Sequence, residues 1–221
     1  MEATKRKLHL GCGERYLQGY HNIDFPPVEH TVQIYTRVDE YADILKLRYP
    51  AGSIEEVRLH HVFEHFSRPV ACALIAAWWS WLRPRGLLHI EVPDFDLTAW
   101  AVLNPFLSER ARHVALRHIF GSQEAAWALH QEGWSPRRLK QLLVSMGFDD
   151  IKIAKNSYQG TYNFEILAMK SRTDLSKQDF EQLAQAFLSK YNVNDTSTEE
   201  RMLEAWMEIY RRQIEASWAA S

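Results

Sequence analysis

Residues 8–13, Leu-His-Leu-Gly-Cys-Gly, and residues 22–24, Asn-Ile-Asp, are the stretches that decide the fold. The first has the pattern of a strand that ends in a glycine turn, and the second that of a strand ending in a carboxylate. Glycine has no Cβ, so the backbone can turn sharply at a strand end and approach a ligand closely. A carboxylate at the end of the next strand can accept hydrogen bonds from both hydroxyls of a ribose. The pattern predicts the first half of a nucleotide-cofactor site in an α/β sheet.

The composition favours one folded domain with an appendage. The chain has 221 residues, 46% of them hydrophobic, which is enough for a sizeable core. With 26 basic and 28 acidic residues the formal charge is -2, so nothing indicates a general affinity for nucleic acid or anionic membranes. Two cysteines make no disulfide framework, the amino terminus lacks an apolar secretory segment, and no apolar run approaches the roughly 20 residues of a membrane span. We expect a cytoplasmic protein without a transmembrane segment.

Apolar runs of strand length alternate with helix-like segments along most of the chain. They predict seven strands, at residues 7–11, 20–24, 31–35, 54–60, 86–92, 149–154 and 163–169. Only ten residues separate Gly13 from Asp24, so we expect the first connecting helix to be short or missing. Residues 69–82 predict a crossover helix whose tryptophans, Trp78 and Trp81, pack in the core. The last two strands are expected to pair as a hairpin.

Two helical additions accompany the predicted sheet. Residues 95–130 predict short helices above the carboxyl edge of the sheet, where an insertion can cover a site. Ser135 and Pro136 predict the N-cap and the first turn of a further helix. From Asp174 onward the pattern is only helical, and the sequence STEE at residues 197–200 predicts a capping box. The apolar stripe of the last helix fits either its own domain or a second subunit, which leaves a homo-oligomer open.

Several stretches, in the expected order, resemble the class I S-adenosylmethionine-dependent methyltransferases, and most closely the small bacterial branch associated with polysaccharide biosynthesis. They lie within residues 7–170 and read LHLGCGERYLQGYHNIDF, ADILKL, VRLHHVFEHF, WLRPRGLLHIEVPDFD and HQEGWSPRRLKQLLVSMGF. The resemblance implies a Rossmann-like, seven-stranded, mostly parallel sheet flanked by helices, with S-adenosyl-L-methionine as the cofactor. We expect this domain at residues 1–172, with the helical insertion at 95–130 and a C-terminal helical extension at 173–221.

The resemblance also implies cofactor-binding residues, namely Gly11, Gly13, Asp24 and Asp43, and we add Cys12 in the turn and His60 as further candidates. The two glycines match the glycine turn of the family, and Asp24 matches its ribose-binding acid. Asp43 matches a position after the third strand that approaches the adenine. His60 lies opposite to His61 on a predicted strand, so packing is the alternative for this residue.

Residues 61–65, His-Val-Phe-Glu-His, match the H-x-x-E-H signature of zinc hydrolases, and two interpretations compete. In a hydrolase the motif is helical: both histidines bind zinc, the glutamate activates water, and Glu109 or Glu124 supplies a third ligand. In a methyltransferase, residues 57–60 form a strand, so His61 lies at the strand end beside the reactive end of the cofactor. We favour the strand, and we expect no metal because no third ligand follows at a fixed spacing.

Methyl transfer from a sulfonium mainly requires alignment of the acceptor, the methyl carbon and the leaving sulfur, because the electrophile is already activated. A base helps when the acceptor is an alcohol, which must lose a proton during attack. His61 is the candidate base, since a strand end overlooks the pocket and histidine titrates near neutral pH. Asp94 and His130 are alternative catalytic residues, and His65 is a further candidate. For each of them, binding of the acceptor is equally open.

Three classes of function fit these residues. The first, which the resemblance favours, is O-methylation of a sugar or glycan in polysaccharide biosynthesis. The second is methylation of another small metabolite, and the third is a non-catalytic cofactor-binding subunit whose C-terminal helices hold a partner. Aromatic residues of the insertion suit stacking on a sugar face and suit core packing as well. A zinc hydrolase is a minor alternative. We expect a small-molecule or glycan acceptor and no nucleic acid.

Overall fold

The computed structural model describes residues 6–26, 28, 37–158 and 160–219. Its strands are β1 (Arg6–Leu10), β2 (His21–Asp24), β3 (Glu40–Tyr41), β4 (Ile54–His60), β5 (Leu82–Pro93), β6 (Phe148–Tyr158) and β7 (Thr161–Lys170). They form one seven-stranded sheet in the order β3-β2-β1-β4-β5-β7-β6. Neighbours from β3 to β5 are parallel, whereas β7 is antiparallel to β5 and β6. The predicted mostly parallel sheet and its closing hairpin are confirmed.

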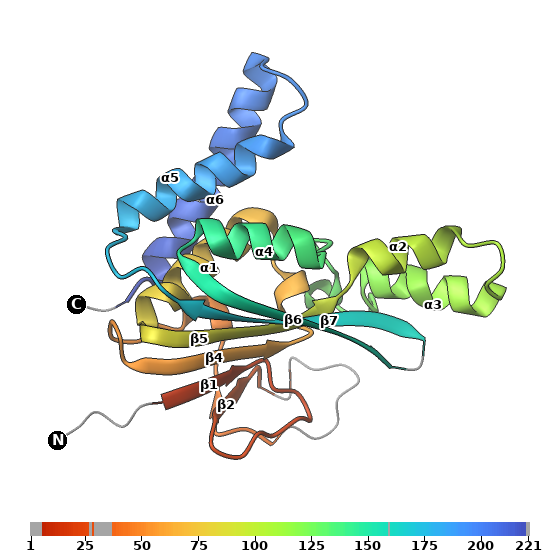
Figure 1. Ribbon diagram of the computed structural model, residues 1–221, viewed down its shortest axis with the longest axis horizontal. Helices are drawn as coiled ribbons and strands as arrows, with labels where there is room; N and C mark the ends of the chain where they lie inside the picture. The colour runs from red at the N-terminus through yellow and green to blue at the C-terminus, as the bar shows by residue number, and fades with distance from the viewer. Residues whose placement is uncertain (1–5, 27, 29–36, 159, 220–221) are drawn as a thin grey trace.

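The helices are α1 (Arg68–Trp81), α2 (Phe95–Leu103), α3 (Glu109–Phe120), α4 (Pro136–Ser145), α5 (Lys177–Leu188) and α6 (Ser197–Ser217). Shorter 3-10 turns are η2 (Ile44–Lys46), η3 (Phe63–His65), η4 (Ala126–Ala128) and η5 (Ser189–Tyr191). In Figure 1, α1 and α4 lie above the sheet, α5 and α6 lie farther out beside α1, and α2 and α3 project from one end. Among the described residues, no helix is long and apolar enough to cross a membrane.

The strand predictions hold except at the third strand. Residues 31–35 lie outside the described residues, and the third strand of the described sheet is the short β3. Residues 11–20, all of them described, contain turns and no helix between β1 and β2. The expectation of a short or missing first helix is therefore confirmed.

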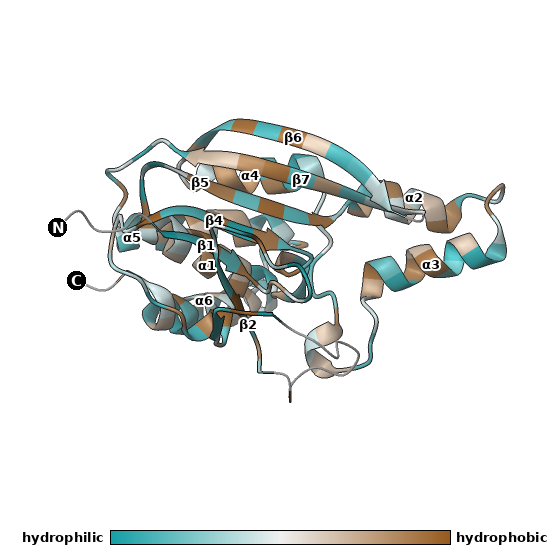
Figure 2. Ribbon diagram, turned by 90° about the horizontal axis from the view of Figure 1, so that it is seen from below, coloured by the Kyte–Doolittle hydropathy of each residue, from teal (hydrophilic) through white to brown (hydrophobic). Residues whose placement is uncertain are grey.

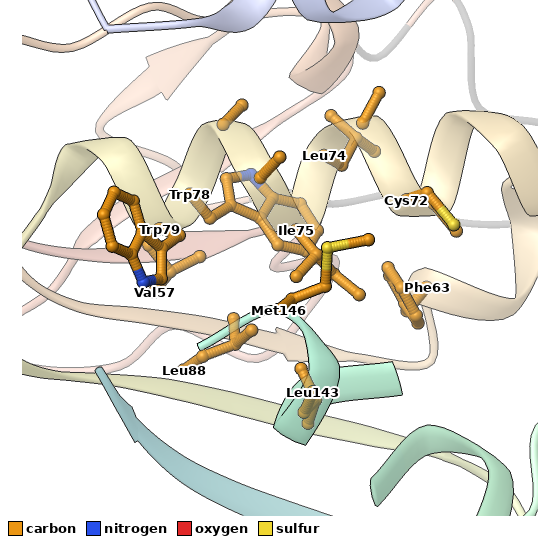
Figure 3. Packing of buried hydrophobic residues seen from close by; sticks show 14 of the residues in the cluster. Val57, Phe63, Cys72, Leu74, Ile75, Trp78, Trp79, Leu88, Leu143 and Met146 are labelled. Carbon is orange, nitrogen blue, oxygen red and sulfur yellow. The ribbon is translucent and has the colours of Figure 1, made fainter. Parts of the chain in front are cut away.

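The two faces of the sheet differ in chemistry because successive side chains of a strand point to opposite faces. One face is apolar and packs against α1 and α4. Figure 3 shows this core, where side chains of the sheet and the helices meet: Val57, Leu88, Ile75, Trp78, Leu143 and Met146. The other face carries polar side chains at the alternate positions: His9, Glu56, Arg58, His60, His89 and Glu91. Figure 2 looks onto this polar face, which no described helix covers.

The capping of the last two helices differs from the prediction. The STEE sequence at 197–200 does not form the expected capping box, because α6 begins at Ser197 and its N-cap residue is Thr196. The nearby Glu199 side chain accepts from the backbone N–H of Val193 instead (3.1 Å). The capping box lies at the start of α5, where Ser176 and Asp179 bond each other's backbone N–H groups.

The last helix packs on its own chain, which is one of the two alternatives for its apolar stripe. Tyr210 and Ile214 are buried in the same core as the sheet and α1. Trp81 Nε1 at the end of α1 donates to the backbone carbonyl of Ser217 (2.8 Å). Gln213 Nε2 donates to the carbonyl of Leu45 in η2 (2.8 Å). These contacts explain the stripe within one chain, and a homo-oligomer through these helices stays a prediction.

This packing predicts unequal costs for two substitutions on α6. Ile214→Ala should lower the free energy of unfolding by about 2–5 kcal/mol, because it leaves a cavity between α6 and α1. Ile209→Ala is the matched control, since Ile209 is 38% exposed, and it should cost less than about 1 kcal/mol. Urea denaturation of both variants measures the difference. Equal costs would contradict the packing of α6 on α1.

Candidate active site

Glycines shape the turn after β1. Gly11 and Gly13 have φ values of 65° and 53°, which L side chains rarely adopt. A Cβ at Gly11 would overlap Cγ2 of Val62 in the loop after β4. The backbone N–H groups of Gly11 and Cys12 both donate to the carbonyl of Ile23 (2.8 and 3.1 Å). The turn is thereby fixed against the end of β2, as the sequence predicts.

Asp24 is the last residue of β2 and faces the glycine turn. Its carboxylate accepts hydrogen bonds from the backbone N–H of Gly13 and from that of Phe25 (2.7 Å). The residue is only 6% exposed. A carboxylate has about four lone-pair sites and accepts several hydrogen bonds at once, which is the chemistry that ribose hydroxyls require. The placement of this acid beside the turn fits the residue's predicted role.

The other predicted cofactor residues already have structural partners. Cys12 is buried, and this burial raises the pKa of its thiol to about 12. Asp43 caps η2, where its side chain accepts from the backbone N–H of Leu45 (2.9 Å). Burial, together with Arg15 and Arg58, lowers the pKa of His60 to about 3. These contacts give each residue a structural role, and their part in cofactor binding stays a prediction.

A row of histidines runs across the polar face of the sheet toward the strand ends. His9 bonds Asn22 through Nδ1 (3.1 Å) and His60 through Nε2 (3.0 Å). His60 Nε2 lies 3.8 Å from one oxygen of Glu91, and His61 Nε2 lies 3.6 Å from the other. This histidine row, from His9 to His61, leads from the glycine turn to the end of β4.

His61 follows β4 directly, which confirms its predicted place at a strand end. Its φ is 52°, and only residues 63–65 continue as a 3-10 turn. The helix that a zinc hydrolase requires is therefore missing. Burial alone would lower the pKa of His61, but the carboxylates of Glu64 and Glu91 raise it to about 10. A protonated ring cannot accept a proton, so the two carboxylates oppose a role of His61 as a catalytic base. That role stays a prediction.

Glu64, His65 and His130 meet at the same edge of the sheet. One ligand atom from each lies within 4.8 Å of the others. His130 Nε2 is 3.9 Å from Glu64 Oε1, and burial lowers the pKa of the His130 ring. The expectation of no metal rests on the lack of a third ligand at a fixed spacing. His130 comes from a distant part of the chain, so its place beside Glu64 has no sequence spacing to reveal it, whereas Glu109 and Glu124 are exposed and lie outside the cluster.

Asp94, an alternative catalytic residue, has a structural place in the fold. It is 1% exposed and is the N-cap of α2, where its side chain accepts from the backbone N–H of Leu97 (3.3 Å). Its second oxygen lies 3.5 Å from Nζ of Lys155. The cap and the ion pair give the Asp94 carboxylate a structural role, and its catalytic role stays a prediction.

The α2–α3 arm (residues 95–120) extends outward from the carboxyl end of β5 (Figure 1). His118 in α3 fixes the arm to β7, because its Nε2 bonds Oδ1 of Asn163 (2.9 Å). The His118 ring also lies 6.1 Å from that of His61. The predicted short helices are thus present and border the site. Their outer surface exposes large aromatic side chains: Trp100, Phe106 and Phe120.

Sequence reasoning missed two members of the site, Glu91 and His118. Glu91 sits at a polar alternate position of β5, a pattern that ordinarily indicates a solvent-facing residue. Its pKa is lowered to about 2, mainly by its hydrogen bond with His61. His118 lies in the insertion, where no periodic pattern points to the strand ends. The one usable signal in the sequence was the position of Glu91, directly before the Val-Pro-Asp stretch at residues 92–94, where β5 ends.

Comparisons with known proteins agree at the level of the fold. No protein-family model and no curated protein matches the chain. A SAM-dependent methyltransferase from Archaeoglobus fulgidus superposes with a TM-score of 0.51 and 17% identity, over 76% of this chain and 87% of that one. A Haloferax volcanii complex of the Trm112 methyltransferase activator with a protein described as a methyltransferase gives 0.52 and 13%, over 80% and 86%. These likenesses show a class I methyltransferase fold.

The contact of the glycine turn with the loop after β4 predicts a steric cost that a second substitution relieves. Gly11→Ala should lower the free energy of unfolding by about 2–4 kcal/mol, from left-handed strain of about 1–2 kcal/mol and overpacking of about 1–3 kcal/mol. Adding Val62→Ala should recover the overpacking part. Gly19→Ala is the control, because Gly19 has a φ of 84° and no described atom within 4 Å of the place that a Cβ would take. If Gly19→Ala costs as much, the Val62 contact is unimportant.

Proposed function

We propose that the chain is an S-adenosylmethionine-dependent methyltransferase. The observation that carries the proposal is the turn after β1, where Gly11 and Gly13 adopt positive φ and Gly13 N–H bonds the carboxylate of Asp24. The class I methyltransferase fold around this turn supports it. In open α/β sheets, ligands bind at the carboxyl ends of the strands, which is where this turn lies.

The residues of the turn fit the cofactor. Glycine keeps the backbone free of a Cβ where a ligand must approach, and the carboxylate of Asp24 is a group that accepts hydrogen bonds from ribose hydroxyls. When bound, the cofactor supplies an activated methyl group. The chain has to bind the cofactor, hold the acceptor in line with the methyl carbon and exclude water. His61, Asp94 and His130 are the residues that we propose to contact the acceptor: His61 and Asp94 directly follow β4 and β5, and His130 Nε2 lies 3.9 Å from Glu64 Oε1.

The acceptor that we propose is a hydroxyl of a sugar or glycan. The resemblance of the sequence motifs to the polysaccharide-associated branch supports this choice. Exposed aromatic side chains on the α2–α3 arm also support it, because flat apolar rings suit the face of a sugar. An open groove of ≈ 510 Å³ beside α3 is lined in part by Arg110, Arg117 and Tyr158 and not by His61, Asp94 or His130, so it offers space only for a part of the acceptor away from these residues.

Cofactor binding is testable by calorimetry with S-adenosylhomocysteine, the demethylated product. The unmutated chain should bind it, and Asp24→Ala should weaken binding by about 1–3 kcal/mol, or about 5- to 150-fold, because hydrogen bonds to a charged group are lost. Asp195→Ala, a change to an exposed residue before α6, is the control and should bind as the unmutated chain does. Circular dichroism checks that Asp24→Ala remains folded.

Two results of this titration would count against the proposal. If the unmutated chain does not bind S-adenosylhomocysteine, the chain is not a methyltransferase of this type. If Asp24→Ala is folded and binds with unchanged affinity, Asp24 is not the ribose-binding acid. Binding without any transfer to an acceptor would instead favour the non-catalytic cofactor-binding subunit.

The acceptor class is tested by transfer of a labelled methyl group to a panel of nucleotide sugars, glycan fragments and small metabolites. We expect transfer to a sugar hydroxyl, with the product identified as an O-methyl ether by nuclear magnetic resonance. Methylation of only nitrogen or carboxylate acceptors would reject the glycan and favour another small metabolite. The Trp100→Ala variant should weaken the apparent affinity for the acceptor while cofactor affinity stays unchanged, because Trp100 is 59% exposed on the arm.

A further inference from the structure

We propose that Glu64, His65 and His130 form a binding site for a divalent transition-metal cation, with Zn²⁺ as the cation that best fits the ligands. One ligand atom from each residue lies within 4.8 Å of the other two. The three residues come from η3 and from the segment after η4, which the chain brings together at the carboxyl edge of the sheet. Binding of the cation is independent of the proposed methyltransferase function.

Both histidines are held in the tautomer that a metal ligand needs. His65 Nδ1 lies 3.1 Å from the backbone carbonyl of Leu129, and His130 Nδ1 lies 3.0 Å from that of His118. A carbonyl oxygen only accepts, so each Nδ1 carries the hydrogen and donates it. The Nε2 atom of each ring then keeps its lone pair. A ring N–H donated to a backbone carbonyl is the usual support for a metal-bound histidine.

Glu64 is the observation that points most directly to a ligand. The residue is 2% exposed, and neither carboxylate oxygen accepts a hydrogen bond from the described residues. Burying a carboxylate without such bonds is costly unless a cation compensates it. His61 Nδ1 lies 3.3 Å from Oε1 and is one compensating group. A carboxylate has about four lone-pair sites, so Glu64 can bind a metal as well.

The backbone holds two of the three ligands together, and a small cavity lies beside them. This cavity of ≈ 10 Å³ is bordered by Glu64 and His130 but not by His65, and its volume is about the smallest that holds one water-sized particle. The backbone N–H groups of Gln131 and Glu132 both donate to the carbonyl of Glu64 (2.8 and 3.2 Å). These bonds fix the segment after His130 to the backbone of Glu64, so two ligands are held by one rigid unit.

The chemistry of the donors selects the class of cation. Two imidazoles and one carboxylate are the protein ligands of known catalytic zinc sites, which leave a fourth position open. Hard cations such as Mg²⁺ and Ca²⁺ prefer sites made of oxygen atoms. Among the first-row divalent ions, Zn²⁺ and Cu²⁺ bind nitrogen ligands more tightly than Mn²⁺ or Fe²⁺. We therefore choose Zn²⁺ as the probe.

The proposed site differs from the H-x-x-E-H arrangement of zinc hydrolases. There the two motif histidines are ligands and the glutamate is the base. Here Glu64 is itself a ligand, and His61 faces carboxylates with both ring nitrogens, Glu64 with one and Glu91 with the other. The site therefore gives no support to a hydrolase. If the proposed function is correct, the open position suits an acceptor oxygen, whose pKa a cation would lower.

The test is a zinc titration of the full chain, without an affinity tag, after removal of metal with a chelator and dialysis. Calorimetry, with a chromophoric chelator as competitor for tight binding, should show one Zn²⁺ per chain. His130→Ala and Glu64→Gln should each weaken binding by about 100-fold or more, since loss of a supporting group alone costs about 10- to 100-fold. His113→Ala is the matched control, because His113 is exposed on α3 and should bind as the unmutated chain does.

A titration with Co²⁺ provides a second measurement. The visible absorption of bound Co²⁺ should appear in the unmutated chain and in His113→Ala, and should be lost in His65→Ala. Circular dichroism confirms that each variant is folded, and His65→Ala serves where His130→Ala does not fold. The proposal is overturned if the unmutated chain binds no stoichiometric Zn²⁺, or if folded ligand variants bind it as tightly as His113→Ala.

Failure of this proposal is distinguishable from failure of the proposed function. S-adenosylhomocysteine is titrated into the metal-free chain in a separate experiment. Binding of this compound without Zn²⁺ binding rejects the metal site and leaves the methyltransferase standing. Zn²⁺ binding without binding of this compound supports the metal site and rejects the methyltransferase.

Discussion

The short connection between β1 and β2 is the constraint on which the rest of the structure depends. Ten residues lie between Gly13 and Asp24, and they hold no helix. Among the described residues, no helix therefore covers one face of the sheet. Apolar side chains stabilise the fold only where they are buried, so the face without a helix carries polar side chains. The alternation of β4 and β5 meets this requirement. It places His60 and Glu91 on the open face, and Leu59 and Ile90 in the core.

The polar face ends in a set of mutually compensating charges. Glu91 lies on the open face, Glu64 is buried at the strand end, and His61 lies between them. The carboxylates raise the pKa of His61 to about 10, and the hydrogen bond from His61 is the main cause that lowers the pKa of Glu91 to about 2. His61 is therefore the group that joins the two carboxylates, and Arg15 lies 4.0 Å from the second oxygen of Glu91.

Local sequence patterns predicted most of the strands and helices, whereas they did not predict contacts between distant parts of the chain. The strand at residues 54–60 agrees with β4 at both ends, because alternation and turn residues are local signals. The predicted capping box at Ser197 failed because the helix starts one residue earlier than the box requires, with Thr196 as the N-cap, and helix ends are set by contacts that spacing does not reveal. The sequence did not group Glu64 with His130 for a related reason. His130 reaches Glu64 through backbone bonds of residues 131 and 132, and sequence separation carries no information about such contacts.

The helix α1 is buried on all sides by the elements that pack against it. Twelve of the fourteen residues of α1 are buried, and a helix that is apolar on all sides needs neighbours on all sides. The sheet covers one side, and α5 and α6 cover the other, with Trp81 bonded to Ser217 across that boundary. The C-terminal helices thus complete the core. Trp100 and Phe106 stay exposed on the α2–α3 arm, so part of the apolar surface that the chain leaves to solvent lies on this arm and away from the core around α1.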